Sequence, residues 1–257
     1  MPNAHEVWAA VAGTTVGEAW LRRDESKPPE TVARFHEAVA QLERGVPFAY
    51  AVRRAGFRTL DLAIDSRALI PRPETEGLVE LVLEHAKRGL AADIGTGCGC
   101  IALALAVEGA FAKIVAVEQS AGAAALAREN LNRVAPRTPV EIREGNLLAP
   151  LVDKGERFGV IVSNPPYLSG GEYDELDPSV RAHEPREALV SGEDGLAATR
   201  SLFAGAARLL EPGGLLALEI DERRADAVRT LAHEHGWDVA IHVDLFGCPR
   251  YALAQEA

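Results

Sequence analysis

Hydrophobic and polar positions change their spacing repeatedly between residue 90 and the end of the chain. Short apolar runs, which predict buried strands, alternate with longer amphipathic stretches, which predict helices. The predicted strands cover 90–95, 113–118, 140–145, 158–163, 214–220, 237–244 and 250–255, and the predicted helices cover 99–108, 120–134, 195–210 and 222–235. This alternation predicts an α/β fold with a parallel sheet and helices on both faces, and the last two strands read as an antiparallel pair.

The first 90 residues follow a different pattern. Two helices are predicted at 7–21 and 29–44, and Trp8 and Trp20 on the first of them are expected in a core. A strand at 59–64, with a β-hairpin lead-in, and a helix at 72–88 precede the first strand of the sheet. We therefore expect a small helical domain over 1–58 and a larger α/β domain over 59–257. A long loop is expected at 165–194.

Composition narrows the class of protein. Apolar residues make up 47% of the 257 residues, which is ample for a buried core. No run approaches 18 apolar residues and the N-terminus lacks a signal-peptide pattern, so we expect a cytoplasmic protein without a membrane span. Three cysteines, an odd number, argue against a disulfide framework, and their spacing is poor for zinc, so we expect no metal.

The tetrapeptide Asn164-Pro165-Pro166-Tyr167 carries the most specific chemistry. It follows a predicted buried strand, so it lies at the carboxyl edge of the sheet, where ligands bind in open α/β folds. The asparagine oxygen and the carbonyl of Pro165 are free to accept hydrogen bonds, and Tyr167 adds a flat ring for stacking. Together they predict a grip on an NH2 group attached to a planar carbon, as in an amide or a nucleobase amine.

A second constellation lies upstream, after the strand at 90–95. The loop Gly95-Thr96-Gly97-Cys98-Gly99 follows Asp93, and the next strand ends at Glu118, about 20 residues later. Glycines let the backbone approach a ligand, and a carboxylate at this strand end can hold two ribose hydroxyls. The spacing G-x-G-x-G differs from the dinucleotide fingerprint G-x-G-x-x-G. Asp93 suits an ammonium group, directly or through water, so S-adenosylmethionine is favoured over a nicotinamide dinucleotide.

With these motifs in place, the chain resembles the HemK-type protein-(glutamine-N5) methyltransferases, which modify peptide chain release factors. The resemblance covers roughly residues 45–257. The segments that carry it are 69–76, with Arg72-Pro73-Glu74-Thr75-Glu76, the loop 93–99, the tetrapeptide 164–167, His183-Glu184-Pro185-Arg186, 192–195 and Leu210-Glu211-Pro212-Gly213-Gly214. It implies the class I S-adenosylmethionine-dependent methyltransferase fold, a Rossmann-like sheet of seven strands whose last strand is antiparallel.

The chain also departs from the family pattern. Asn146 replaces the acidic residue usual near the adenine, and Leu147 replaces an aromatic that often follows it. The family's Glu-Ile-Gly becomes Glu219-Ile220-Asp221, and the N-terminal region is shorter than is usual. We still expect Asn146 and Leu147 to contact the cofactor, beside Asp93, Gly95 to Gly99, Glu118 and Asn164. The resemblance places Arg72 over the active site, while His183 is expected to order the long loop.

The predicted reaction is transfer of a methyl group to the side-chain amide nitrogen of a protein glutamine, and the resemblance implies the Gly-Gly-Gln loop of a release factor. Asn164 and Pro165 would each accept one hydrogen bond from the NH2 group, and Pro166 and Tyr167 would wall it. A DNA or RNA amino-methyltransferase, acting on adenine N6 or guanine N2, uses the same tetrapeptide. The net charge of −11 and the acidic stretch at 172–177 disfavour a nucleic-acid substrate. A non-catalytic S-adenosylmethionine-binding protein is a further alternative.

Overall fold

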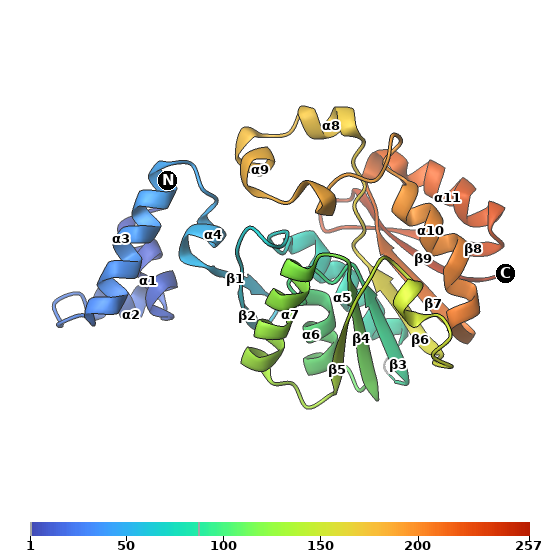
Figure 1. Cartoon of the computed structure of the whole chain (residues 1–257), viewed down its shortest axis with the longest axis horizontal. Coiled ribbons are helices and arrows are strands. Elements are labelled where there is room, and N and C mark those ends of the chain that lie inside the picture. Colours follow the sequence, from blue (N-terminus) through green and yellow to red (C-terminus); the bar gives the residue numbers. More distant parts are fainter. Residues whose placement is uncertain (1, 87) are drawn as a thin grey trace.

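Seven strands form one sheet in the order β5-β4-β3-β6-β7-β9-β8 in the computed structural model, which describes residues 2–86 and 88–257 (Figure 1). All neighbouring pairs are parallel except those that involve β9, which runs antiparallel to both β7 and β8. The strands are β3 (Leu90–Ile94), β4 (Lys113–Glu118), β5 (Val140–Glu144), β6 (Phe158–Ser163), β7 (Leu210–Glu219), β8 (Trp237–Val243) and β9 (Pro249–Glu256). The predicted seven-stranded sheet with an antiparallel last strand is confirmed.

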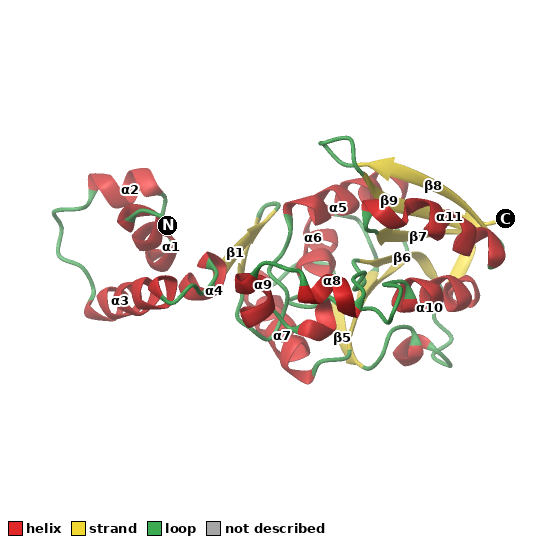
Figure 2. Ribbon diagram, turned by 90° about the horizontal axis from the view of Figure 1, so that it is seen from above, coloured by secondary structure: helices red, strands yellow, loops and turns green. Residues whose placement is uncertain are grey.

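Helices cover both faces of this sheet (Figure 2). One face carries α5 (Pro73–His85), α6 (Cys100–Glu108) and α7 (Ala121–Val134), and the other carries α10 (Ala197–Ala206) and α11 (Ala225–Glu234). The α5 helix was predicted to reach residue 88, and residue 87 of that stretch lies outside the described residues. Short 3-10 turns span Ala149–Leu151, Arg186–Ala188, Ala207–Leu209 and Glu222–Arg224.

The near-continuous apolar strands are explained by burial on both sides. In β4, Ile114 and Ala116 point into the core under α5, α6 and α7, whereas Val115 and Val117 point into the core under α10 and α11. Successive side chains of a strand face opposite sides of a sheet, so a central strand between two helical layers needs apolar residues at every position. This is why the bounds of β4 and β6 could be read directly from the sequence.

The N-terminal helices form a separate unit at one end of the molecule (Figure 1). They are α1 (Ala4–Ala12), α2 (Val16–Leu21), α3 (Pro29–Glu43) and α4 (Phe48–Val52). A small core of their own includes Val7, Val11 and Ala38. The hairpin of β1 (Arg54–Phe57) and β2 (Leu60–Ala63) follows, so the proposed boundary at residue 58 falls in its turn.

Two predictions in this N-terminal unit were wrong. The single helix predicted over 7–21 is broken, because Gly13 takes a left-handed conformation (φ 70°) that ends α1, and Thr15 then caps α2 with Glu18. The break turns Trp20 outward, so that 52% of it is exposed instead of lying in the core. Trp8 is half-buried against Phe35, with ring centroids 5.5 Å apart.

The segment predicted as a long loop also has structure. It contains α8 (Gly170–Asp174) and α9 (Pro178–His183), and both lie over the carboxyl edge of the sheet (Figure 1). A short parallel bridge joins Leu168 to Val190, and Leu168, Tyr173 and Leu189 form a small apolar cluster against which Val190 packs. The helices were missed because each is only one to two turns long, too short to show helical periodicity.

Candidate active site

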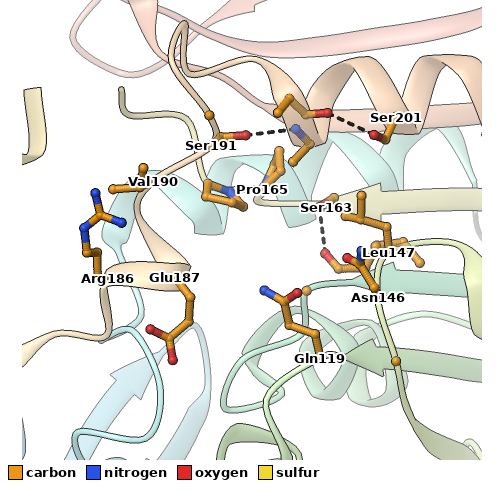
Figure 3. A pocket seen from close by; sticks show the side chains of 17 residues that line it. Gln119, Asn146, Leu147, Ser163, Pro165, Arg186, Glu187, Val190, Ser191 and Ser201 are labelled. Atoms are coloured by element: carbon orange, nitrogen blue, oxygen red, sulfur yellow. Dashed lines mark hydrogen bonds between the residues drawn. The ribbon is translucent and has the colours of Figure 1, made fainter. Parts of the chain in front are cut away.

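Two adjoining cavities lie at the carboxyl edge of the sheet. The larger cavity has a volume of about 490 Å³ and reaches from the ends of β3 and β6 to the segment 186–201. The smaller cavity, of about 90 Å³, lies beside it, and the two share the lining residues Gly95, Gln119, Pro166 and Glu187. Figure 3 shows Gln119, Asn146 and Leu147 on one side of the larger cavity, facing Arg186, Glu187 and Val190 across it.

The glycine loop connects β3 to α6 and forms part of this edge. Gly95 and Gly97 have positive φ angles of 71° and 58°, and a Cβ atom on either would meet nothing within 4 Å. Left-handed backbone favours glycine, and the open space in front leaves the backbone accessible to a ligand. The loop is held in place from behind, because the amides of Gly95 and Thr96 both donate to the Val117 carbonyl of β4, at 2.8 and 3.0 Å.

Asp93 stands behind the loop and does not line either cavity. Its Oδ2 accepts from the Thr96 hydroxyl at 2.5 Å and from the Ala102 amide at 3.1 Å. Its Oδ1 is buried and has no hydrogen-bond partner among the described residues. Burial raises the pKa of Asp93 from 3.8 to about 7, against the lowering effect of its two hydrogen bonds. An unpaired buried carboxylate oxygen is stabilised by a nearby positive charge, which it could meet here only from behind the glycine loop.

Glu118 ends β4 and reaches toward the same loop. Its Oε2 accepts from the Gly97 amide and its Oε1 from the Ser120 amide, both at 2.9 Å. It lines the smaller cavity together with Gln119. Gln119, which was not predicted, lines both cavities, and its position directly after the acidic strand end was the signal that could have identified it.

Asn146 and Leu147, which were predicted to contact the cofactor, follow β5 and line the larger cavity. Leu147 has φ 46°, which is unusual for a leucine and strains its backbone by roughly 1–2 kcal/mol. Its side chain packs against the core beneath α10 and lines the larger cavity. Two side chains of the glycine loop that were also predicted to contact the cofactor point elsewhere. The Cys98 side chain is buried in the core, and the Thr96 hydroxyl donates to Asp93.

The tetrapeptide lies where β6 ends, as expected. Pro165 lines the larger cavity, Asn164 the smaller one, and Pro166 lines both. Tyr167 lines neither of them and is mostly buried, and this burial raises the pKa of its phenol to about 12. Asn164 therefore stands at the junction between the two cavities.

The Asn164 side chain is held by a chain of two hydrogen bonds. Its Nδ2 donates to the Thr75 hydroxyl at 3.1 Å, and that hydroxyl donates to Glu219 Oε2 at 2.7 Å. Thr75 and Glu219 are each 2% exposed. Burial raises the pKa of Glu219 from 4.5 to about 7. Thr75 and Glu219 were noted in the sequence only as parts of motifs, because nothing in it shows that they meet across 144 positions.

Arg72 does not line either cavity. It fastens the covering segment, residues 165–194, parts of which line both cavities. Its Nη2 donates to Glu184 Oε1 at 2.7 Å, and the Glu184 side chain is only 2% exposed. Within the His183-Glu184-Pro185-Arg186 motif, Glu184 is thus the residue that ties the covering segment to the start of α5. His183 was expected to order this segment and is half-buried at the end of α9.

Part of the acidic stretch is used internally. Glu172 pairs with Arg224 at 2.5 Å and with Arg223 at 3.1 Å, and Asp177 caps α9. The charge at this rim is therefore lower than the sequence suggested. Among the described residues, no group of three or more His, Cys, Asp or Glu side chains is placed to hold a metal, and no helix is long and apolar enough to cross a membrane.

Comparisons with known proteins agree with this architecture. A family model described as "Methyltransferase small domain" matches residues 73–179. A release factor glutamine methyltransferase of Xylella fastidiosa is 44% identical over 223 residues, covering 85% of this chain and 80% of the relative. One from Streptomyces coelicolor is 37% identical over 262 residues, covering 99% and 90%.

A solved structure supports the fold. A methyltransferase from Pyrococcus furiosus superposes with a TM-score of 0.58 at 22% identity, over 88% of this chain and 96% of the other. The sheet is that of the class I methyltransferases, whose methyl donor is S-adenosylmethionine. The two release factor glutamine methyltransferases are about 40% identical to this chain over most of its length and theirs, which shows a common family as well as a common fold. The chain belongs to the release factor glutamine methyltransferase family.

Proposed function

We propose that this protein methylates the side-chain amide nitrogen of a glutamine in a peptide chain release factor, with S-adenosylmethionine as the methyl donor. The observation that carries the proposal is the orientation of Asn164. Because its Nδ2 is directed at Thr75, its Oδ1 is left to accept a hydrogen bond at the junction of the two cavities. An acceptor is what an incoming amide NH2 group requires.

The residues proposed to hold the cofactor fit its chemical parts. Gly95 and Gly97 leave open space for a ligand against their backbone. The unpaired buried oxygen of Asp93 lies behind the loop and would act on a cationic group through a bridging water. Glu118 would accept from the ribose hydroxyls at the strand end, and Asn146 and Leu147 would contact the adenine. S-adenosylmethionine supplies an electrophilic methyl group when bound.

The substrate amide needs positioning more than it needs a base. Its nitrogen lone pair is delocalised, so the nitrogen is a poor nucleophile until its geometry changes. Asn164 Oδ1 and the Pro165 carbonyl would each accept one hydrogen bond from the NH2 group, which favours a pyramidal nitrogen with its lone pair directed at the methyl carbon. The nitrogen becomes acidic once it carries the methyl group and then releases one proton to solvent, so no strong base is needed. Orientation of this kind can lower a barrier by several kcal/mol, and acceptors at a site of developing positive charge add to it.

The covering segment would exclude water from the reaction. It is tied to the larger domain at two points, by Arg72 to Glu184 and by Arg224 to Glu172. A closed, dry site strengthens each hydrogen bond made to the amide. Release factors work on ribosomes, so the proposal places the enzyme in the cytoplasm. The N-terminal helices, with Trp20 exposed, would contact the protein substrate.

The test of this function is Asn164→Ala. Because Asn164 lines the smaller cavity but makes no contact that holds the glycine loop, we expect S-adenosylmethionine affinity to stay within a few-fold while turnover on a release factor is lost. Affinity is measured by calorimetry and turnover by transfer of labelled methyl. Unchanged turnover would refute the assigned role of Asn164. Label on RNA or DNA would support the amino-methyltransferase alternative.

A further inference from the structure

The hydrogen-bonded chain behind Asn164 has a direction that its chemistry fixes. Asn164 follows β6, and Glu219 ends the neighbouring strand β7, where Ser163 pairs in register with Leu218. Thr75, in the first turn of α5, lies between the two side chains, 3.1 Å from Asn164 and 2.7 Å from Glu219. The three residues come from three elements and meet directly beside the proposed methylation site.

A threonine hydroxyl has one hydrogen to give. When Glu219 is ionised it can only accept, so the hydroxyl hydrogen of Thr75 goes to Glu219. The Thr75 oxygen is then available only as an acceptor, and Asn164 must present its NH2 group to it. The Oδ1 atom of Asn164 consequently faces the substrate side.

Protonation of Glu219 removes this constraint. The carboxylic acid can then donate to the Thr75 oxygen, which frees the hydroxyl hydrogen to bind Asn164 Oδ1. The Asn164 amide can rotate by half a turn and present its NH2 group to the substrate NH2 group. Two donors then face each other, so the substrate amide loses one of its two acceptors and keeps only the Pro165 carbonyl.

We propose that Thr75 and Glu219 are positioning residues that set the orientation of the Asn164 amide, and that protonation of Glu219 switches that orientation off. This inference rests on the proposed function, because it gives Asn164 Oδ1 the role of accepting from the substrate amide. Substitution of either residue should therefore change turnover, whereas S-adenosylmethionine binding depends on other groups.

The surroundings of Glu219 bring its pKa into the pH range in which the folded protein can be assayed. Its pKa is raised to about 7, mainly by burial, with the Thr75 hydrogen bond opposing that effect. The charged groups that act on it are Arg250 on β9 and Arg72 and Glu74 at the start of α5. Both arginines are engaged elsewhere, Arg250 by Asp244 at 3.2 Å and Arg72 by Glu184 at 2.7 Å.

Two phenols and one further carboxylate complete this environment. Tyr167 and Tyr251 both feel the charge of Glu219, and Asp221 acts on Tyr167. Burial raises the pKa of each phenol to about 12, so both stay neutral over the range in which Glu219 titrates. Titration near pH 7 within this group is therefore that of Glu219.

The first experiment needs no substrate. The side-chain NH2 signals of Asn164 are followed by nitrogen-15 NMR from pH 5.5 to 8.5, and Asn164→Ser identifies them by their disappearance. We expect these signals to shift with a midpoint near pH 7 in the wild type and to show no such transition in Glu219→Gln. A wild-type signal that is constant with pH, or an equal transition in Glu219→Gln, would overturn the inference.

The second experiment measures turnover on a release factor at saturating S-adenosylmethionine, so that Asp93, the other buried carboxyl with a pKa near 7, does not limit the rate. Below pH 7 we expect kcat of the wild type to fall tenfold for each pH unit. In Glu219→Gln we expect kcat to stay constant from pH 6 to 8. Thr75→Val, which keeps the shape and removes the hydroxyl, should lower kcat at least tenfold, with KM for S-adenosylmethionine within about twofold. Thr75→Ser should restore kcat to within a few-fold.

The controls separate this inference from the function on which it rests. An inactive Asn164→Ala beside a Thr75→Val with wild-type kcat would refute the positioning role alone. A fully active Asn164→Ala would refute the role of Asn164 and this inference with it. A wild type that leaves the release factor unlabelled would refute the proposed function itself, while the NMR titration would still report on the hydrogen-bonded chain. If Thr75→Val fails to fold in thermal unfolding, the pH profile of Glu219→Gln decides.

Discussion

The buried carboxyl of Asp93 leads to a prediction about stability and pH. Its Oδ1 has no partner among the described residues, and its pKa is raised from 3.8 to about 7. The folded protein therefore keeps a proton on Asp93 up to about pH 7, whereas the unfolded chain releases it near pH 4. Since the folded state binds more protons in this window, the contribution of Asp93 to stability is present below pH 4 and is lost as the pH rises to 7.

The magnitude follows from the size of the window. A difference of about three pH units at about 1.4 kcal/mol per unit corresponds to a loss on the order of 4 kcal/mol between pH 4 and pH 8. Asp93→Asn cannot ionise, so it should not show this loss. The asparagine NH2 group would lack a partner at the Oδ1 position, at a cost of roughly 1–3 kcal/mol, but that cost does not depend on pH.

The assay is urea unfolding at a series of pH values from 4.5 to 8.5. The free energy of unfolding of Asp93→Asn, minus that of the wild type, should rise with pH by a few kcal/mol. Asp238→Asn, an exposed position on β8, is the matched control and should give a difference that is flat with pH. A flat difference for Asp93→Asn as well would refute the argument from burial.

The same variant tests the proposed role of Asp93 toward the cofactor. An unpaired buried anion is stabilised by a cation, so removing the charge should weaken S-adenosylmethionine binding by about tenfold or more at pH 8, where Asp93 is ionised. Calorimetry measures this. If stability responds as predicted and affinity does not, Asp93 supports the glycine loop without acting on the ligand.

Two further predictions concern other parts of the site. Glu118→Gln should weaken S-adenosylmethionine binding by about tenfold, since a neutral amide is a poorer acceptor for ribose hydroxyls, and affinity within twofold of the wild type in calorimetry would contradict this. Arg72→Met leaves the buried Glu184 without its ion-pair partner, at a cost of about 3 kcal/mol. Residues 165–194 should then be cleaved faster in limited proteolysis, whereas Arg23→Met, at an exposed pair 3.7 Å apart, should leave the rate unchanged. Equal rates in all three proteins would argue against the tie.

The sheet could be predicted because its strands are buried on both faces. Runs such as 113–118 and 158–163 are apolar at nearly every position and end at polar residues, so they are visible without any tertiary information. The elements that were missed depend on local caps or on distant contacts. The break at Gly13 follows from one left-handed residue, and α8 and α9 are short helices stabilised by contacts with distant segments.

The sequence predicted which motifs form the site but not which of their side chains contact one another. Asn164 and Glu118 lie at the strand ends where the spacing placed them. The sequence could not show that Thr75 connects Asn164 to Glu219, because each hydrogen bond joins residues 89 or 144 positions apart. Nor could it show that Glu184, and not His183, pairs with Arg72, since both belong to one short motif.

The central claim is the transfer of a methyl group to a release factor glutamine. The most direct measurement follows the transfer of labelled methyl from S-adenosylmethionine. It compares three acceptors: a release factor, its variant in which the Gly-Gly-Gln glutamine is alanine, and total RNA and DNA from the same cells. We expect label on the release factor alone, and none on the glutamine variant. Label that persists on the variant, or that enters RNA or DNA instead, would contradict the account.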